Sequence, residues 1–311
     1  MAAGDEVGEA EVAAAVSDFR RRGDDGYLGE SFDAIAGAGA NGAIVHYKAV
    51  AGSESHRTLD TSAPFLLDSG GQYLEGTTDV TRTVHFGTPT AHQREAFCRV
   101  LQGHIALDTC VWPADTPGFV LDAFARQPLW RLGLSYGHGT GHGVGACLNV
   151  HEGPASISAR FENTQPLLPG MVMSNEPGYY EEGDEGFGIR IENLVVVVEA
   201  VEVEARRKKR LSHAPAAEQS HGCFLQFERL TMVPIQKSLV VAPLAEGGHG
   251  TVLLPAERDW LDTYHRQVWA AVSPRLQGEG DGAALAWLEA ACAPLPPCKT
   301  LEEFADAGSF E

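Results

Sequence analysis

Short alternating runs of apolar and polar residues before Thr90 predict that strands dominate the first part of the chain. The clearest runs are GAIVHYKAV (42–50), APFLLDSGG (63–71) and TTDVTRTVHFG (77–87). Further along, RIENLVVVVEAVEVEA (190–205) is rich in β-branched residues, and FERLTMVPI (227–235) resumes the pattern. These segments are therefore predicted to be strands as well.

A helical period replaces the alternation after Thr90. Thr90 and Gln93 form a capping box, and the apolar residues that follow recur at helical spacing up to about Trp112 and Pro113. We therefore expect a helix that ends near that Trp-Pro pair.

A second helix is predicted to begin at Thr116 and Pro117. Pro128 should kink or shorten it. One face of this helix carries apolar residues, namely Val120, Leu121 and Phe124.

Two late amphipathic segments, DWLDTYH (259–265) and GAALAWLEAAC (282–292), predict further helices. From Lys299 the chain reads as an acidic tail, over residues 299–311. The mixed order of elements predicts an α+β fold, with helices packed on a largely antiparallel sheet.

The composition of the chain indicates which class of protein it belongs to. A chain of 311 residues, 44% hydrophobic, can bury a real core in one large domain or two small ones. The N-terminus lacks a signal-peptide pattern, and no apolar run is long enough to span a membrane. Six scattered cysteines without a CxxC pair argue against a zinc finger or a disulfide framework and favour reduced thiols inside the cell.

The charge balance disfavours nucleic acid and anionic lipid as partners. The chain has 23 basic and 42 acidic residues and a formal net charge of -19. RRKKR (206–210) is the exception and has the composition of a localisation signal. It lies in a polar stretch of about 204–222, which favours a solvated loop over a signal.

Four carboxylates lie in segments that are otherwise apolar or tightly turning. Asp68 ends a strand and Asp79 lies inside the next one, with a glycine-containing turn between them. Glu176 precedes Pro177 and Gly178, which restrict the backbone and so fix the direction of its side chain; Glu192 lies in a run suited to burial. A buried carboxylate needs a cation or several donors.

Each carboxylate also has a simpler interpretation when taken alone. Asp68 can cap a turn and Asp79 can face solvent. Glu192 can form an ion pair with Arg190 on the same face of the strand.

Between the two pairs of carboxylates lies HGTGHGVGACLNVHEGP (138–154). Alternating glycines exclude a helix, so the spacing of His138 and His142 is not that of a helical zinc motif. In an extended segment these glycines remove side chains from one face, while the histidines project from the other. Taken alone, His138 or His151 is more simply a satisfied core histidine.

Together, two aspartates, two glutamates and one histidine form an oxygen-rich ligand set that suits a pair of divalent ions with a bridging water. In this order, the segments LLDSG, TTDVTRT, HGTGHGVG, NVHEGP, NEPGYY and GIRIEN resemble the catalytic domain of the aminopeptidase P (Xaa-Pro aminopeptidase) family. The resemblance is strongest to its long, eukaryote-type cytosolic branch and runs from DFRRR (18–22) to ALAWLEA (284–290). It implies a pita-bread fold, a curved antiparallel sheet flanked by helices.

The resemblance also implies roles for individual residues. The metal ligands would be Asp68, Asp79, His142, Glu176 and Glu192, which in this family usually hold two manganese ions, with cobalt or zinc as alternatives. Substrate binding would fall to His46, His138, His151 and Arg190. Glu176 would transfer the proton, while His142 and His151 would stabilise the oxyanion formed by attack of a bridging hydroxide.

The expected substrate is therefore a peptide with a free N-terminus and proline in the second position, cleaved in the cytoplasm by a homodimer. Residues 1–298 would form the catalytic domain, truncated at its N-terminal helices, because members of this branch carry other domains before it. We therefore expect a fragment or a shortened form.

Three alternatives stay open at this point. Prolidase and methionine aminopeptidase share the fold and the five ligands. Pita-bread domains also occur as binding modules without catalysis, although these typically lose ligands. A truncated chain can also be inactive.

Overall fold

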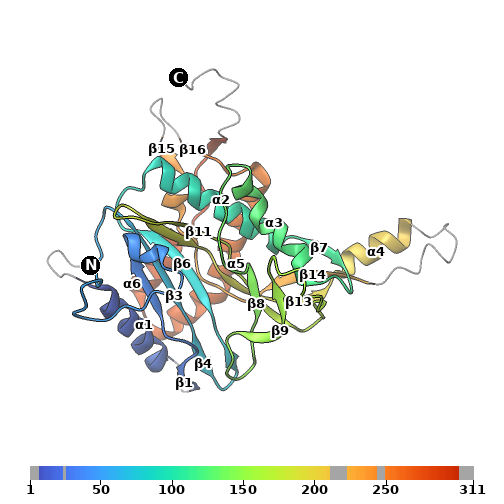
Figure 1. The fold of residues 1–311 in the computed structure, drawn as a ribbon, viewed down its shortest axis with the longest axis horizontal. Coiled ribbons are helices and arrows are strands. Elements are labelled where there is room, and N and C mark those ends of the chain that lie inside the picture. The colour runs from blue at the N-terminus through green and yellow to red at the C-terminus, as the bar shows by residue number, and fades with distance from the viewer. Residues whose placement is uncertain (1–6, 24–25, 211–222, 244–248, 301–311) are drawn as a thin grey trace.

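The computed structural model describes residues 7–23, 26–210, 223–243 and 249–300. Figure 1 shows helices and strands intermixed along the chain, as an α+β fold requires. The described helices are α1 (Glu9–Gly23), α2 (Ala91–Asp108), α3 (Gly118–Trp130), α4 (Val201–Arg210), α5 (Pro255–Glu279) and α6 (Gly282–Cys292), with short 3-10 helices η1 (Gly39–Ala43) and η3 (Lys237–Leu239).

The largest sheet has six antiparallel strands in the order β7-β14-β13-β10-β8-β9. Their bounds are β7 (Val111–Pro113), β14 (Phe224–Arg229), β13 (Asn193–Glu199), β10 (Val172–Asn175), β8 (Gly141–Gly143) and β9 (Glu152–Ile157). The last pair in the β10–β13 ladder is Asn175 with Asn193. Glu176 and Glu192 each lie one residue beyond this pair, so the ladder brings the two glutamates together.

A second antiparallel sheet, β2-β3-β6, faces this end of the ladder. It comprises β2 (Ile35–Ala38), β3 (Pro64–Ser69) and β6 (Val80–His85). Asp68 lies in β3 opposite Thr81, and Asp79 immediately precedes β6 instead of lying inside it as expected. Smaller sheets contain β1 (Tyr27–Glu30), β4 (Gly71–Tyr73) and β5 (Gly76–Thr77); β11 (Gly178–Glu181) and β12 (Phe187–Arg190); and β15 (Ala242–Pro243), β16 (His249–Thr251) and β17 (Cys298–Thr300).

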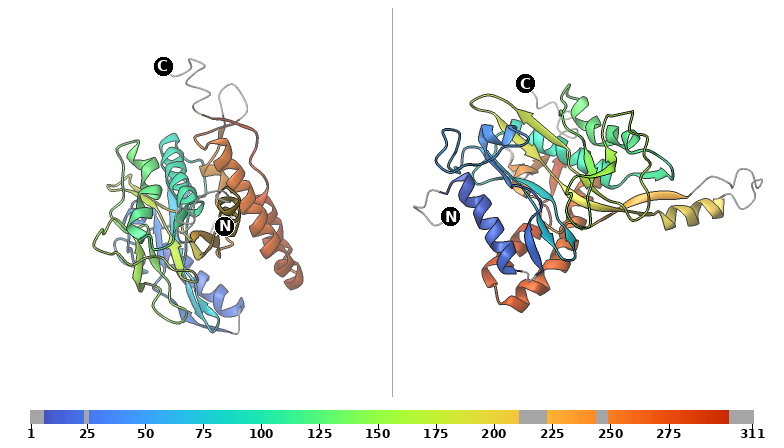
Figure 2. Two further views of the ribbon diagram at one scale, coloured as in Figure 1. Left: turned by 90° about the vertical axis from the view of Figure 1, so that its right-hand side faces the viewer. Right: turned by 60° about the horizontal axis from the view of Figure 1, so that its bottom comes forward.

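Two apolar cores support these sheets. One joins α2 and α5 to β11 and β12 through residues such as Leu101, Ile189 and Leu261. The other packs α3 against the six-stranded sheet. The paired helices α5 and α6 form an outer layer on one side of the strands (Figure 2).

Several predicted elements are confirmed. The segments 63–71 and 77–87 contain β3 and β6, and the capping box of Thr90 and Gln93 opens α2. The two late helices are present as α5 and α6. None of the described helices combines the length and the apolar content that crossing a membrane requires, and all six cysteines are free thiols.

The strand predicted at residues 42–50 is wrong. This segment contains the end of η1 and then tight turns, closed by hydrogen bonds from Ile44 N to Asn41 O and from Tyr47 N to Ile44 O. Gly42 packs so closely on Gly188 of β12 that a Cβ on Gly188 would lie 1.7 Å from the Gly42 carbonyl oxygen. The chain therefore turns here and forms no ladder.

The predicted limits of two helices are also wrong. The helix expected to reach Trp112 ends at Asp108, since Val111–Pro113 leaves it to pair with β14 as β7. Pro128 does not shorten α3, which continues to Trp130.

The expected apolar face of α3 is buried only at Leu121. Val120 and Phe124 are 46% and 48% exposed, whereas Leu121, Ala125 and Leu129 are buried. Packing against α2 and β9 selects this neighbouring face.

The polar stretch predicted as a loop begins with a helix. The strand β13 ends at Glu199, and Val201–Arg210 forms α4, which projects from the body of the molecule (Figure 1). Ion pairs of Glu202 with Arg206 and of Glu204 with Arg207 have the spacing that stabilises a helix. Residues 211–222 lie outside the described part.

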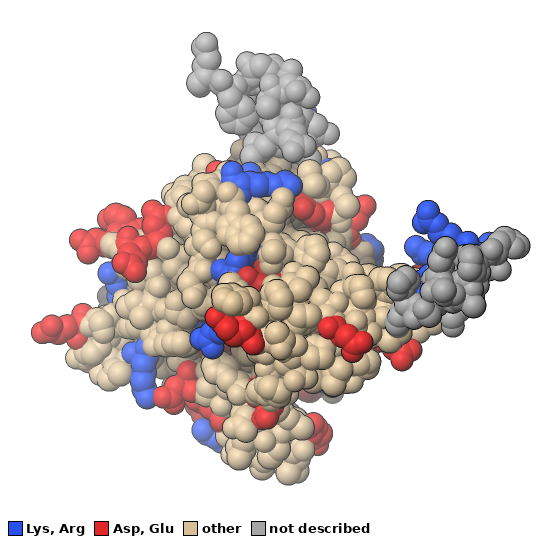
Figure 3. Space-filling view, turned by 45° about the vertical axis from the view of Figure 1, so that its right-hand side comes forward, with Lys and Arg blue, Asp and Glu red and all other residues tan. Residues whose placement is uncertain are grey.

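RRKKR therefore belongs to α4 as far as the structure describes it. Figure 3 shows basic side chains on this projection, while acidic and basic side chains are both spread over the rest of the visible face. At the other end of the chain, the expected tail begins later than Lys299, because Cys298–Thr300 pairs with β16; residues 301–311 lie outside the described part.

Candidate metal centre and its pocket

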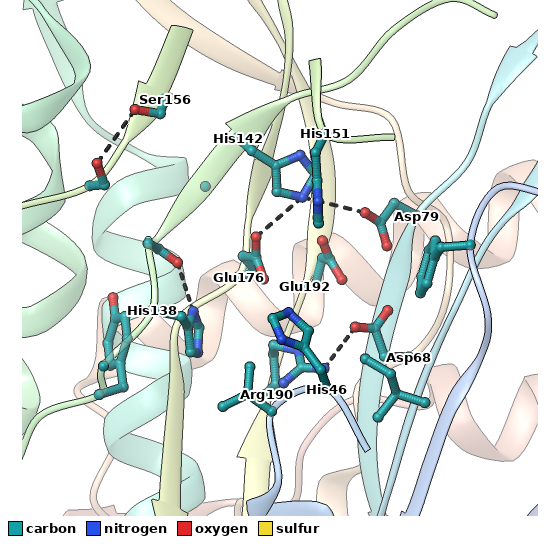
Figure 4. Close-up of a pocket in the computed structure, with 18 of the residues that line it drawn as sticks. His46, Asp68, Asp79, His138, His142, His151, Ser156, Glu176, Arg190 and Glu192 are labelled. Carbon is teal, nitrogen blue, oxygen red and sulfur yellow. Dashed lines mark hydrogen bonds and ion pairs between the residues drawn. The ribbon is translucent and has the colours of Figure 1, made fainter. Parts of the chain in front are cut away.

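A cavity of about 890 Å³ opens where the two main sheets meet. Figure 4 shows carboxylates and histidines from both sheets pointing into it. Nine residues singled out from the sequence line this cavity: His46, Asp68, Asp79, His138, His142, His151, Glu176, Arg190 and Glu192. Segments more than 140 residues apart thus contribute to one site.

His142 lies close to two of the carboxylates that are candidate ligands. Its Nε2 lies 3.5 Å from Asp79 Oδ2 and 3.3 Å from Glu176 Oε1. Ligand atoms of Asp79, His142 and Glu192 all lie within 4.8 Å of one another, a grouping that can hold a metal ion. Asp68 and Glu176 flank this group (Figure 4).

Burial leaves some of these oxygen atoms without partners. Asp68, Asp79 and Glu192 are 7%, 4% and 1% exposed. Within the described chain, Asp68 Oδ1 and Asp79 Oδ1 are buried and accept no hydrogen bond. Buried carboxylate oxygens without donors are costly, and a divalent cation satisfies them directly. The donor set therefore fits one or more hard or borderline metal ions.

Electrostatics support the same conclusion. Burial, with a contribution from neighbouring Asp68, raises the pKa of Asp79 to about 6. Burial raises the pKa of Glu176 to about 7, and burial with three nearby carboxylates raises that of Glu192 well above its usual range. Carboxylates resist ionisation when they are crowded together in a dry site, and a bound cation would reverse this effect.

At His142 the surroundings favour the charged form, whereas at the carboxylates they favour the neutral form. Burial disfavours its charged form, but the hydrogen bond with Asp79 and the charge of Glu176 outweigh this and raise the pKa of His142 to about 9. Its Nδ1 lies 2.9 Å from Gly143 O, which leaves Nε2 directed at the carboxylates. That is the orientation a metal-binding histidine needs.

The other three histidines differ in how they are held. Burial lowers the pKa of His138 to about 4, and its Nε2 lies 2.8 Å from Tyr180 Oη. His151 packs edge-on against His142 with ring centroids 4.3 Å apart, and burial lowers its pKa. His46 is exposed on the turn after η1 and reaches into the cavity (Figure 4).

Arg190 pairs with a different carboxylate from the one expected. Its Nη2 donates to Asp68 Oδ2 at 2.7 Å, so the alternative in which it neutralises Glu192 is wrong. Glu192 instead accepts a hydrogen bond from Thr81 Oγ1 at 2.7 Å. Glu192 lies beyond the end of β12, in the short link to β13, and Thr81 Oγ1 lies between it and Arg190, accepting from Arg190 Nε at 3.2 Å.

Two of the alternating glycines, Gly141 and Gly143, act as predicted. A Cβ on Gly141 would lie 2.1 Å from the Ser174 carbonyl oxygen, and one on Gly143 would lie 2.3 Å from that of Glu152. β8 can therefore approach β9 and β10 closely, which brings His142 beside Glu176. Ser174 Oγ joins the two, since it accepts from His142 N and donates to Glu176 Oε1.

Sequence reasoning missed several residues that hold the site. Tyr180 accepts a hydrogen bond from Arg190 Nη1 at 2.6 Å and also contacts His138. Arg126 and Asp122 form a buried ion pair on α3, in which Arg126 donates to the carbonyls of Tyr136 and His138.

A partial signal for the missed ion pair was present. Asp122 and Arg126 are four residues apart on a predicted helix, a spacing typical of a surface pair. Only the packing of α3 beneath the glycine-rich segment makes the pair buried.

Two family models together match most of the chain. Residues 1–199 match the model of metallopeptidase family M24, and residues 223–295 match the C-terminal region of peptidase M24. Aminopeptidase P2 of Arabidopsis thaliana is 53% identical over 270 residues, which cover 87% of this chain and 34% of that protein. The chain thus spans about a third of the length of this relative.

Solved structures share the fold. The X-prolyl aminopeptidase of Caenorhabditis elegans, a cytosolic enzyme with a dinuclear active site, matches with a TM-score of 0.79 and 38% identity, over 94% of this chain and 43% of that one. Prolidase from Pyrococcus furiosus matches with a TM-score of 0.54 and 29% identity, over 62% and 54%. The expected pita-bread fold is therefore confirmed. With the family model matching most of its length, this chain belongs to metallopeptidase family M24.

Proposed function

We propose that this chain is the catalytic part of a metalloaminopeptidase that hydrolyses the N-terminal Xaa-Pro peptide bond. The observation that carries the proposal is the convergence of the five candidate ligands and three further histidines on one cavity. The identity with aminopeptidase P2 supports the choice of reaction.

The ligands of the proposed centre are Asp68, Asp79, His142, Glu176 and Glu192. Four carboxylates and one imidazole suit two manganese ions, and cobalt or zinc would also be accepted. When bound, the ions supply Lewis acidity that lowers the pKa of a water molecule towards neutrality.

The chain's own side chains would perform the proton transfer and the charge stabilisation. Glu176 would accept the proton of the attacking water and deliver it to the proline nitrogen as the peptide bond breaks. His151 would stabilise the negative charge on the carbonyl oxygen. The sequence-based assignment of the same role to His142 fits less well, because its Nδ1 contacts Gly143 O and its Nε2 would hold metal. His151 is exposed and lies at the cavity wall, from which it can reach a substrate.

Substrate recognition would involve His46, His138, His151 and Arg190. A proline nitrogen in a peptide bond carries no hydrogen, and the fixed ring presents a compact shape to a preformed pocket. Arg190 would act indirectly, because its guanidinium already bonds Asp68 and Tyr180.

The second candidate function is that of a prolidase, a dipeptidase, because the P. furiosus prolidase has the same fold. Cleavage of Arg-Pro with Arg-Pro-Pro spared would favour it, whereas a preference for the tripeptide supports the aminopeptidase.

The experiment that tests the proposal compares wild type with His46→Ala. We expect wild type to cleave Arg-Pro-Pro and to spare Arg-Ala-Ala. His46→Ala should keep its metal content and melting temperature but lose roughly tenfold or more in kcat/KM, because His46 contacts substrate and not metal. Equal cleavage of both peptides by wild type would contradict the proline specificity.

We further propose a cytoplasmic homodimer that forms through this domain. The C. elegans enzyme is cytosolic, which supports the compartment. Multi-angle light scattering at micromolar concentration should give twice the chain mass, about 66 kDa on the basis of 33.2 kDa per chain. A mass of one chain across the concentration range would reject the dimer.

A further inference from the structure

His46 depends on its backbone for its position. It is exposed, and within the described chain its ring makes no hydrogen bond or ion pair. The turn that carries it is closed by a single hydrogen bond, from Tyr47 N to Ile44 O at 2.9 Å. Ile44 is itself 52% exposed. Beyond His46, Lys48 forms an ion pair with Asp33 at the surface, and Tyr47 is the buried residue that can anchor the turn.

Tyr47 is buried and reaches a carboxylate far away in the sequence. Its hydroxyl donates to Glu9 Oε2 at 2.8 Å. Burial and the hydrogen bond with Glu9 raise the pKa of Tyr47 to about 12, so the hydroxyl stays protonated and keeps donating. The turn is thereby tied to the first residue of α1.

Glu9 is 0% exposed, and its carboxylate gathers donors from three parts of the chain. It accepts from Ala38 N at 2.7 Å, where β2 ends, and from Arg57 N at 3.0 Å, where the loop returns. Asn41 Nδ2 in η1 donates to both of its oxygens, at 2.9 and 3.1 Å. A buried carboxylate that receives this many donors is stable and holds them in one geometry.

The segment from β2 to Arg57 is thus fastened at its start, middle and end to one side chain. His46 lies within this segment, next to the residue that forms the middle contact, and Figure 4 shows its ring in the cavity with Asp68 and Arg190. Tyr47 lines the cavity beside His46, whereas Glu9 is absent from the described lining.

We infer that Glu9 and Tyr47 are positioning residues for substrate binding, which act by fixing the turn that carries His46. The inference rests on the proposed function, since it assigns these residues to the recognition of the Xaa-Pro peptide. A displacement of a contact group by about 1 Å can cost up to a hundredfold in rate. A loose turn would therefore weaken catalysis without touching the metal ligands.

The test is a double-mutant cycle of Tyr47→Phe with His46→Ala. Tyr47→Phe removes only the hydroxyl. It should lower kcat/KM for Arg-Pro-Pro by roughly tenfold, mainly through KM, and leave metal content unchanged. In the His46→Ala background the same change should have little further effect on kcat/KM, because the group it positions is gone.

Hydrogen exchange gives a readout that does not depend on activity. Amides of residues 44–57 should exchange faster in Tyr47→Phe and in Glu9→Gln than in wild type. Tyr179→Phe is the matched control, since it removes a hydroxyl that donates to Glu181 Oε2 at another place. This variant should keep the wild-type exchange rate in 44–57 and the wild-type kcat/KM.

Two results would overturn the inference: an unchanged kcat/KM in Tyr47→Phe, or an equal loss in the wild-type and His46→Ala backgrounds. Both need an active wild type. A wild-type enzyme that cleaves no Xaa-Pro peptide would reject the proposed function instead, and the exchange experiment would still report whether Glu9 and Tyr47 hold the turn.

Discussion

Asp79 illustrates how single residues define this site. Its carboxylate is buried, one oxygen has no partner in the described chain, and the other lies 3.5 Å from His142 Nε2. Burial raises its pKa to about 6, which means that the folded chain tolerates the charge of Asp79 poorly without a cation. Asp79 is therefore well suited to bind a metal ion and poorly suited to a purely structural role.

This reasoning predicts that Asp79→Asn weakens metal binding and leaves the metal-free protein at least as stable as wild type. Added manganese should raise the melting temperature of wild type, and the variant should gain much less, because one charged ligand is lost. Bound metal measured by mass spectrometry should fall below the wild-type ratio.

Asp108→Asn is the control for this experiment, since Asp108 is an equally buried aspartate that pairs with Arg229 and Trp260 away from the cavity. It should lower the melting temperature with and without metal and keep the metal content. Wild-type metal binding by Asp79→Asn would refute the ligand assignment.

At the scale of elements, the close approach of β8 to β10 positions the chemistry. Gly141 permits this approach, and Ser174 of β10 bridges His142 to Glu176. A strand spacing widened by even one methyl group would separate the two candidate ligands.

Gly141→Ala should therefore destabilise the fold by about 1–3 kcal/mol, the usual cost of overpacking, and reduce hydrolysis strongly. Its Cβ would lie 2.1 Å from the Ser174 carbonyl oxygen. Gly137→Ala, in the same glycine-rich segment, is the matched control because nothing lies within 4 Å of its Cβ position. Thermal unfolding and activity should separate the two variants, and equal behaviour would show that the close approach is unimportant.

At the scale of the whole molecule, buried neutral histidines couple folding to pH. Burial lowers the pKa of His265 to about 4 and that of His104 to about 3. His265 Nε2 accepts a hydrogen bond from Ile235 N at 3.1 Å and joins α5 to the chain beyond β14. The folded state therefore needs His265 neutral.

The lowered pKa of His265 determines how the stability of the fold depends on pH. Above pH 6.5 both states hold His265 neutral, so this residue adds no pH dependence. Between pH 6.5 and about 4 the unfolded chain binds a proton that the folded chain refuses, and stability falls by about 1.4 kcal/mol per pH unit.

His265→Gln keeps an acceptor for Ile235 N and cannot titrate. Its free energy of unfolding, measured in denaturant at pH 7, 6 and 5, should fall less steeply with acidity than that of wild type. The carboxylates of the cavity contribute equally to both proteins and cancel in the comparison. Parallel slopes would contradict the assignment.

The sequence alone determined what is local or compositional. Glycine alternation excluded a helix around His142, and the capping box fixed the start of α2, because both follow from the backbone preferences of adjacent residues. The order of acidic and glycine-histidine segments identified the fold and the candidate ligands, since a metal site needs particular donor atoms whatever lies between them. Each of these features depends on a few residues with strong preferences, either for a backbone conformation or for the atoms that bind a metal ion.

Only the tertiary structure decided which groups meet. Arg190 bonds Asp68 and not its sequence neighbour Glu192, since β3, which carries Asp68, packs against β12. Residues 42–50 turn instead of forming a strand because Gly42 packs on Gly188 and Glu9 holds Tyr47. Contacts between segments far apart in sequence outweigh local propensities of a few tenths of a kcal/mol per residue, and no local pattern encodes them.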